Sequence, residues 1–121
     1  MARVIFYDRF GAAVAYMDNA QTVVLFDGRP AGLIRGGSVY GYSGRHLGWL
    51  KDGWIRDHDG NAVYFASGQR GGGPVPPAPR VPPVPAAPQV PPVPAAAEVP
   101  PVPPVPSLAW SDLSGPALFE D

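Results

Sequence analysis

The stretch GRHLGWLKDGWIRDHDG (residues 44–60) contains one complete copy of a short repeat that decides the fold of the first half of the chain. Glycines recur at nearly the same interval along that half, at positions 11, 28, 44 and 60, with spacings of 17, 16 and 16 residues. An Asp or Ser beside a Gly, between short apolar runs, is typical of a tight hairpin turn, because Gly adopts positive φ at no steric cost. Each copy of the repeat therefore predicts one β-hairpin.

The residues around the four glycines follow a common pattern. A ring and a short polar residue precede each turn, and a second break joins each hairpin to the next. The pairs before the turns are Tyr7-Asp8, Phe26-Asp27, Tyr42-Ser43 and His58-Asp59, with Arg9-Phe10 inserted in the first copy only. The second breaks are Asn19-Ala20, Gly36-Gly37, Asp52-Gly53 and Ser67-Gly68. We expect eight short strands in four hairpins over residues 3–68.

The predicted strands are apolar on both faces, as in VIFY (residues 4–7) and VAYM (residues 14–17). We therefore expect the hairpins to be covered on both sides. Radial closure into an all-β, flower-like arrangement with pseudo-fourfold symmetry removes the exposed sheet edges, and a partly open eight-stranded meander is the alternative. The position four residues after each turn glycine indicates a crowded place near that axis, because it is small in three copies: Ala15, Gly32 and Gly48, with Tyr64 in the fourth.

The stretch SVYGYSGRHLGWLKDGWIRDHDGNAVYF (residues 38–65), together with the repeated hairpins, resembles the bacterial 4-fold beta flower domain. The resemblance covers residues 3–68 and implies a compact petal arrangement of four β-hairpins. It implies no activity, because no catalytic or ligand-binding residues are established for that family. The layout is also similar to other short hairpin repeats such as MORN repeats, whose Gly-Trp pair occurs here once, at Gly48-Trp49.

Composition and charge divide the chain into two unlike halves. Residues 1–68 carry seven Arg or Lys, six acidic residues and one of the 18 prolines, whereas the remainder has a net charge of −2. The near-neutral first half argues against nucleic-acid binding, which needs a basic surface. The chain has no cysteine, no signal-peptide pattern and no apolar run of the roughly 20 residues that span a membrane. We expect a cytoplasmic protein that binds neither nucleic acid nor membranes.

The predicted module is small for an independent fold. A domain of about 60 residues buries only about 60% of its unfolded surface, and neither disulfides nor an evident metal site supplement this one. Self-association, as a homo-oligomer, or docking of the chain's own tail are the remaining ways to stabilise it.

Candidate functional residues lie mainly in the third and fourth copies. Tyr40, Tyr42, Trp49 and Trp54 give this region a surplus of rings, which either pack in the core or form an aromatic binding patch. His46 departs from the Ala and Pro of the other copies and is either a surface residue or a ligand contact.

A catalytic site is the second hypothesis for these residues. It would combine His46, His58 and Asp57 in a pocket between hairpins of a small, hydrolase-like enzyme. We rank a non-catalytic interaction or scaffold module first, because the Asp residues beside the turns already have a turn role. The run from Asp57 to Gly60 lacks the spacing of a calcium loop, and two histidines make no convincing metal site. We therefore expect neither a metal nor a cofactor.

The tail begins with a flexible glycine joint and continues as the nonapeptides RVPPVPAAP, QVPPVPAAA and EVPPVPPVP (residues 80–106). In a polyproline II helix a period of nine places Arg80, Gln89 and Glu98 on one side. We interpret residues 69–106 as a semi-rigid tether, with a PxxP ligand for an aromatic groove as the alternative.

The last segment, residues 107–121, is apolar again and contains Trp110 and Phe119. We expect it to be a short docking peptide that binds a β-flower module, either its own or that of a neighbouring chain. A frayed terminus is the alternative.

Overall fold

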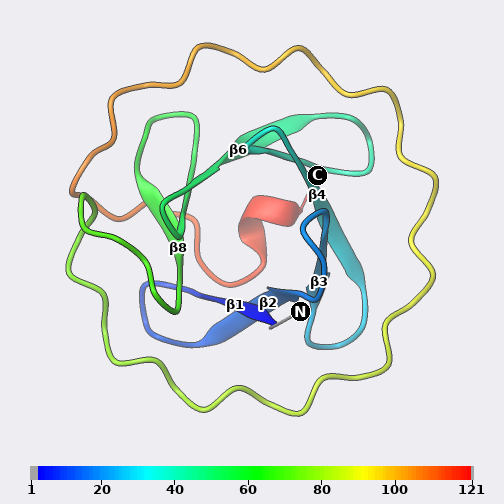
Figure 1. Cartoon of the computed structure of the whole chain (residues 1–121), viewed down its shortest axis with the longest axis horizontal. Helices are drawn as coiled ribbons and strands as arrows, with labels where there is room; N and C mark the ends of the chain where they lie inside the picture. The colour runs from blue at the N-terminus through cyan, green and yellow to red at the C-terminus, as the bar shows by residue number, and fades with distance from the viewer. Residues whose placement is uncertain (1–2, 121) are drawn as a thin grey trace.

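The computed structural model describes residues 3–120, and the four repeats form eight antiparallel strands. The strands are β1 (Val4–Tyr7), β2 (Ala13–Met17), β3 (Thr22–Leu25), β4 (Pro30–Arg35), β5 (Ser38–Tyr40), β6 (His46–Lys51), β7 (Trp54–Arg56) and β8 (Ala62–Ala66). Each strand pairs with its neighbour in the chain, and β1 pairs with β8, which closes the sheet into a barrel (Figure 1). The predicted all-β fold of four hairpins is confirmed, and the closure excludes the open meander.

The four turn glycines have the backbone conformation that the sequence predicts. Their φ angles are 81° at Gly11, 91° at Gly28, 89° at Gly44 and 84° at Gly60. A side chain is strained in this region of backbone space, so glycine is favoured at each turn.

The first copy contains no insertion at its turn, which corrects the sequence alignment. In the first and fourth turns the glycine N–H donates to the carbonyl three residues earlier, Gly11 to Asp8 and Gly60 to Asp57. These turns therefore have the same length, and Arg9 is the equivalent of His58. The additional residue of the first copy lies in the connection between β2 and β3 instead.

The barrel interior is apolar and includes residues from the end of the chain. Phe6, Val23, Val39 and Ile55 are fully buried, and Leu118 and Phe119 join the same core cluster. Phe119 belongs to a 3-10 helix, η1 (Ala117–Phe119), that lies at the centre of the barrel (Figure 1). The C-terminal segment therefore covers the inner faces of strands that the sequence predicts to be covered on both sides.

The proline-rich segment, residues 74–106, is called the belt here. It contains neither helix nor strand and encircles the barrel, as the green-to-orange trace of Figure 1 shows. The sequence predicts a semi-rigid tether over residues 69–106, and its proline-rich part follows the outside of the barrel. The belt bends gradually around the whole barrel, so the chain reaches the barrel centre without a tight reversal. Within residues 3–120, no helix is long and apolar enough to cross a membrane.

Candidate functional site

The belt and Ser107, the residue that follows it, contact the barrel through their main chain at the four hairpin turns. The N–H groups of Arg80, Gln89, Glu98 and Ser107 donate to the carbonyl oxygens of Gly11, Gly28, Gly44 and Gly60, at 2.9, 2.8, 2.8 and 3.1 Å. We call these four donors the contact positions. They are nine residues apart, so one nonapeptide of the tail spans one hairpin of the barrel.

The turn glycines also allow the belt to approach closely. A Cβ atom on any of them would lie closer than 3.0 Å to a carbonyl oxygen of the belt. The carbonyls belong to Ala78, Ala87, Ala96 and Val105, which again are nine residues apart. Glycine is therefore favoured at each turn for two reasons, the positive φ and the space that the belt occupies.

Three of the residues predicted as a binding patch form hydrogen bonds with the chain's own tail. The buried Tyr40 donates its hydroxyl to the carbonyl of Glu98 at 3.2 Å, and the buried Trp54 donates Nε1 to the carbonyl of Arg70 at 2.7 Å. Tyr42 is half-buried and accepts the N–H of Ala95 on its carbonyl at 2.9 Å. These residues of the third and fourth hairpins form part of a surface that binds the tail.

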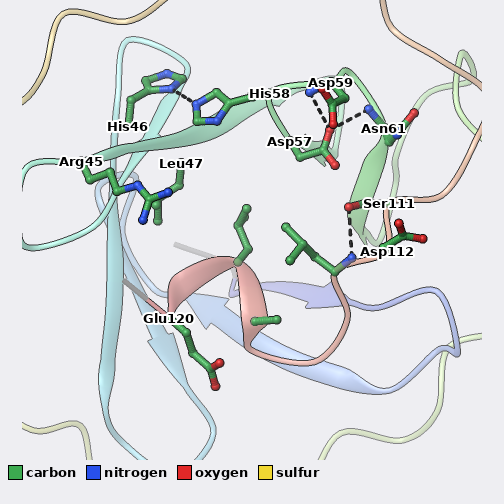
Figure 2. Close-up of a pocket in the computed structure, with 13 residues that line it drawn as sticks. Arg45, His46, Leu47, Asp57, His58, Asp59, Asn61, Ser111, Asp112 and Glu120 are labelled. Carbon is green, nitrogen blue, oxygen red and sulfur yellow. Dashed lines mark hydrogen bonds between the residues drawn. The ribbon is translucent and has the colours of Figure 1, made fainter.

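His46 and His58 come from different hairpins and meet. His46 Nδ1 and His58 Nε2 are 2.9 Å apart and share a hydrogen bond, in which the N–H of one ring donates to the bare nitrogen of the other (Figure 2). The ring of Trp49 lies edge-on to both, with centroids 4.8 Å from His46 and 5.6 Å from His58. His46 is only 3% exposed. Burial, and then the neighbouring His58, lower the pKa of His46, while Glu98 opposes them.

A cavity of about 370 Å³ lies beside this pair, between the third and fourth hairpins and the C-terminal segment (Figure 2). Asp57 lines it, but its carboxylate accepts the N–H groups of Asp59 and Asn61, each at 3.0 Å. In the fourth turn, Asp57 therefore has the structural role that the sequence predicts for Asp59. No group of three metal-ligating side chains occurs within residues 3–120.

The C-terminal segment enters the barrel between the fourth and first hairpins. The N–H of Ala62 donates to the carbonyl of Ala109 at 3.0 Å, and the N–H of Ser111 donates to the carbonyl of Ala62 at 2.8 Å. Between them the half-buried Trp110 packs against Trp54 and Phe65, at centroid distances of 5.9 and 6.2 Å. The segment thus pairs with the free part of β8 and fills an aromatic cluster.

Phe119 lies at the crowded position that the sequence indicates. Its ring stacks on Tyr64, whose hydroxyl donates to the carbonyl of Gly115 at 2.6 Å. A Cβ on Gly32 would come within 3.2 Å of the Phe119 ring. The small residues also have a cause within the sheet, because the atom closest to a Cβ on Gly32 or Gly48 would be a backbone carbonyl oxygen of the next strand, that of Tyr40 or Arg56 respectively.

Sequence reasoning missed three residues of the contact between the tail and the barrel. Arg56 donates to the carbonyl oxygens of Gly60 and Ser107, at 2.7 and 2.8 Å, and to that of Gly72 at 2.7 Å. Glu98 and Ser107 are contact positions with side-chain bonds to the barrel. The nine-residue spacing of the tail was the signal for the last two, since it separates the four contact positions that lie beside the four turns.

The family model of the 4-fold beta flower protein matches residues 4–119. The chain belongs to the 4-fold beta flower protein family. The match extends through the belt and the C-terminal segment, whereas the sequence resemblance covers the hairpins alone. No match to the chain was found among curated proteins or among solved structures.

Proposed function

We propose that this 4-fold beta flower protein is a non-catalytic protein-interaction module, in which the barrel is the receptor and the proline-rich tail is its peptide ligand. The observation that carries the proposal is the match between the contact positions and the four turn glycines. A chain that merely connected two parts would need no such spacing. A surface that accepts one nonapeptide per hairpin has the properties of a peptide-binding site.

We further propose that the belt is a polyproline II helix. The support is a period of three residues in its exposure, because such a helix has three residues per turn. Val81, Val84, Val90 and Val93 are more than 90% exposed, whereas Pro82 and Pro85 are half-buried. At about 3.1 Å per residue, nine residues span about 28 Å, which is then the distance between successive turns along the belt.

A small enzyme remains the second hypothesis, and the contact between His46 and His58 is the observation that favours it. Two features favour the interaction module instead: His46 is buried, and the carboxylate of Asp57 is already bonded to its own turn. A chain with both histidines replaced by Ala separates the hypotheses, because an enzyme would lose its phenotype and an interaction module would keep binding.

The natural partner is either a second copy of the chain, as a homo-oligomer, or another protein with a similar proline-rich segment. The cytoplasm is where we propose to search for it. A pull-down from native lysate, with the tail present and then removed, identifies proteins that need a vacant barrel surface.

The direct test is a chain with a protease site inserted between Gly71 and Gly72, where a side chain would meet no neighbouring atom. After cleavage we expect the barrel and the tail to elute together in gel filtration at micromolar concentration. Separation of the two pieces under native conditions would refute the proposed function.

A further inference from the structure

The third hairpin binds the side chain of its contact position as well as its main chain. Glu98 Oε1 accepts the N–H of His46 at 2.7 Å. The hydroxyl of Tyr40 donates to the Glu98 carbonyl at 3.2 Å. A hydrogen bond to a carboxylate is roughly twice as strong as one between neutral groups. The third hairpin therefore recognises both the negative charge of the Glu98 side chain and the position of its main chain.

The fourth hairpin makes equivalent contacts with different chemistry. The Ser107 hydroxyl donates to Asn61 Oδ1 at 2.7 Å, and Arg56 donates to the Ser107 carbonyl at 2.8 Å. Arg56 and Tyr40 hold the same place in their repeats, four residues before the turn glycine. Each therefore supplies a donor to the carbonyl of a contact position.

The first and second hairpins hold only the main chain. The side chains of Arg80 and Gln89 are exposed. The bonds of these two residues to the barrel come from their main-chain N–H groups. The second hairpin has Pro30 where the third has His46, so it has no N–H for a carboxylate. It also has Val24 where the third has Tyr40, so it lacks the hydroxyl donor.

We infer that the third and fourth hairpins are the selective part of the tail-binding surface, and that they prefer a proline-rich chain with an acidic residue nine positions before a hydroxyl residue. Glu98 and Ser107 determine the specificity, while the first two hairpins bind the main chain of Arg80 and Gln89. This inference rests on the proposed function, because it assigns the ligand class of the same surface.

The occupant in trans is the tail of a second copy of this chain. A second copy offers the same Glu98 and Ser107 at the same spacing, and so it forms every contact that the chain's own tail forms. The joint that would have to change direction has space around it, because a Cβ on Gly71 or Gly72 would meet no atom within 4 Å. The exchange would break the bond from Arg56 to the Gly72 carbonyl, and the second copy's tail would re-form the contacts inside the barrel.

Competition between tails measures the selectivity. The cleaved complex described above is unfolded in urea and mixed with an equimolar synthetic tail of residues 72–121, which carries an isotope label. After removal of urea, mass spectrometry of the re-formed complexes gives the ratio of the two tails. The matched variants are Arg80→Ala and Gln89→Ala in the first two hairpins, and Glu98→Ala, Glu98→Gln and Ser107→Ala in the last two.

We expect the wild-type and labelled wild-type tails to enter equally, and Arg80→Ala and Gln89→Ala to compete within about twofold of them. Glu98→Ala should compete at least about tenfold less well, because it removes a bond to a charged group. Ser107→Ala should lose between about twofold and tenfold. Glu98→Gln keeps an acceptor oxygen and should lie between the wild type and Glu98→Ala.

Equal competition by Glu98→Ala and Arg80→Ala would overturn the selectivity and leave the proposed function standing. Failure of any tail to re-form a complex with the barrel would instead refute the proposed function itself. For the exchange in trans, two intact chains with different mass labels are unfolded together and refolded. Mixed dimers support the exchange, and monomers alone overturn it.

Discussion

The rings of Tyr64 and Phe119 lie almost parallel, with their centroids 5.7 Å apart and an angle of 6° between their planes. Tyr64 belongs to the last strand of the barrel, and Phe119 lies near the end of the chain. Tyr64 is fully buried, and this burial raises the pKa of its phenol. The C-terminal segment is thus a structural component of the core.

Removing the Phe119 ring should destabilise the whole barrel. We expect Phe119→Ala to lower the free energy of unfolding by about 3–5 kcal/mol, because it leaves a cavity beside Tyr64 and Gly32. Urea denaturation followed by tryptophan fluorescence measures the change. Leu108→Ala is the control, since Leu108 is 71% exposed and its loss should cost little. Equal effects of the two variants would contradict the central place of Phe119.

Filling the space at a turn glycine should displace the belt. Gly44→Ala combines backbone strain with a collision against the Ala96 carbonyl. Gly68→Ala is the matched control, because its φ is 80° and a Cβ there meets no atom within 4 Å. We expect hydrogen exchange of the Glu98 amide to accelerate in Gly44→Ala alone. Similar exchange in both variants would show that the belt tolerates a side chain at the turn.

Replacing the guanidinium of Arg56 should weaken its bonds to the glycine joint and to the end of the belt together. The guanidinium bonds three carbonyl oxygens, and a Lys ammonium cannot reproduce this planar fork. We expect Arg56→Lys to cost about 1–3 kcal/mol of unfolding free energy. Arg35→Lys, on an exposed residue, serves for comparison and should be neutral. An unchanged free energy of unfolding in Arg56→Lys would mean that the three hydrogen bonds make no net contribution to stability.

Stability should fall as the solution becomes mildly acidic. Burial is the main reason that the pKa of His46 is lower in the folded state than in the unfolded chain. Below about pH 6.5 the unfolded chain therefore binds a proton at His46 that the folded chain does not bind. The free energy of unfolding is then constant above that pH and decreases as the pH drops toward the folded pKa. Thermal melts between pH 8 and pH 5 measure the slope. His46→Gln should flatten it, and an unchanged slope would assign it to other groups.

The hairpins could be predicted because their determinants are local. A glycine with positive φ between apolar runs defines a turn wherever it occurs, and four copies in register reinforce one another. The same reasoning misplaced the inserted residue of the first copy. The sequence pattern assigned Tyr7 to the ring position that precedes the turn glycine in the other copies. The hydrogen bonds of the turn show that Arg9 holds this position.

The path of the tail could not be predicted because its determinants lie in the barrel. The nonapeptide repeat indicates a stiff, regular chain. Its period of nine residues predicts a contact with the barrel only when the distance between successive hairpin turns is known. Likewise, the contact between His46 and His58 depends on how the third and fourth hairpins close upon each other. The terminal segment was expected to dock, and the sequence left open whether it does so in its own chain.

The position of η1 also bears on the rate of folding. The core joins Phe6 and Val14 to Leu118 and Phe119, which lie more than one hundred residues away in the sequence. Contacts at such separations require a long loop to close, and they slow folding relative to contacts within one hairpin. Completion of the core therefore depends on contacts that are far less local than those of any hairpin.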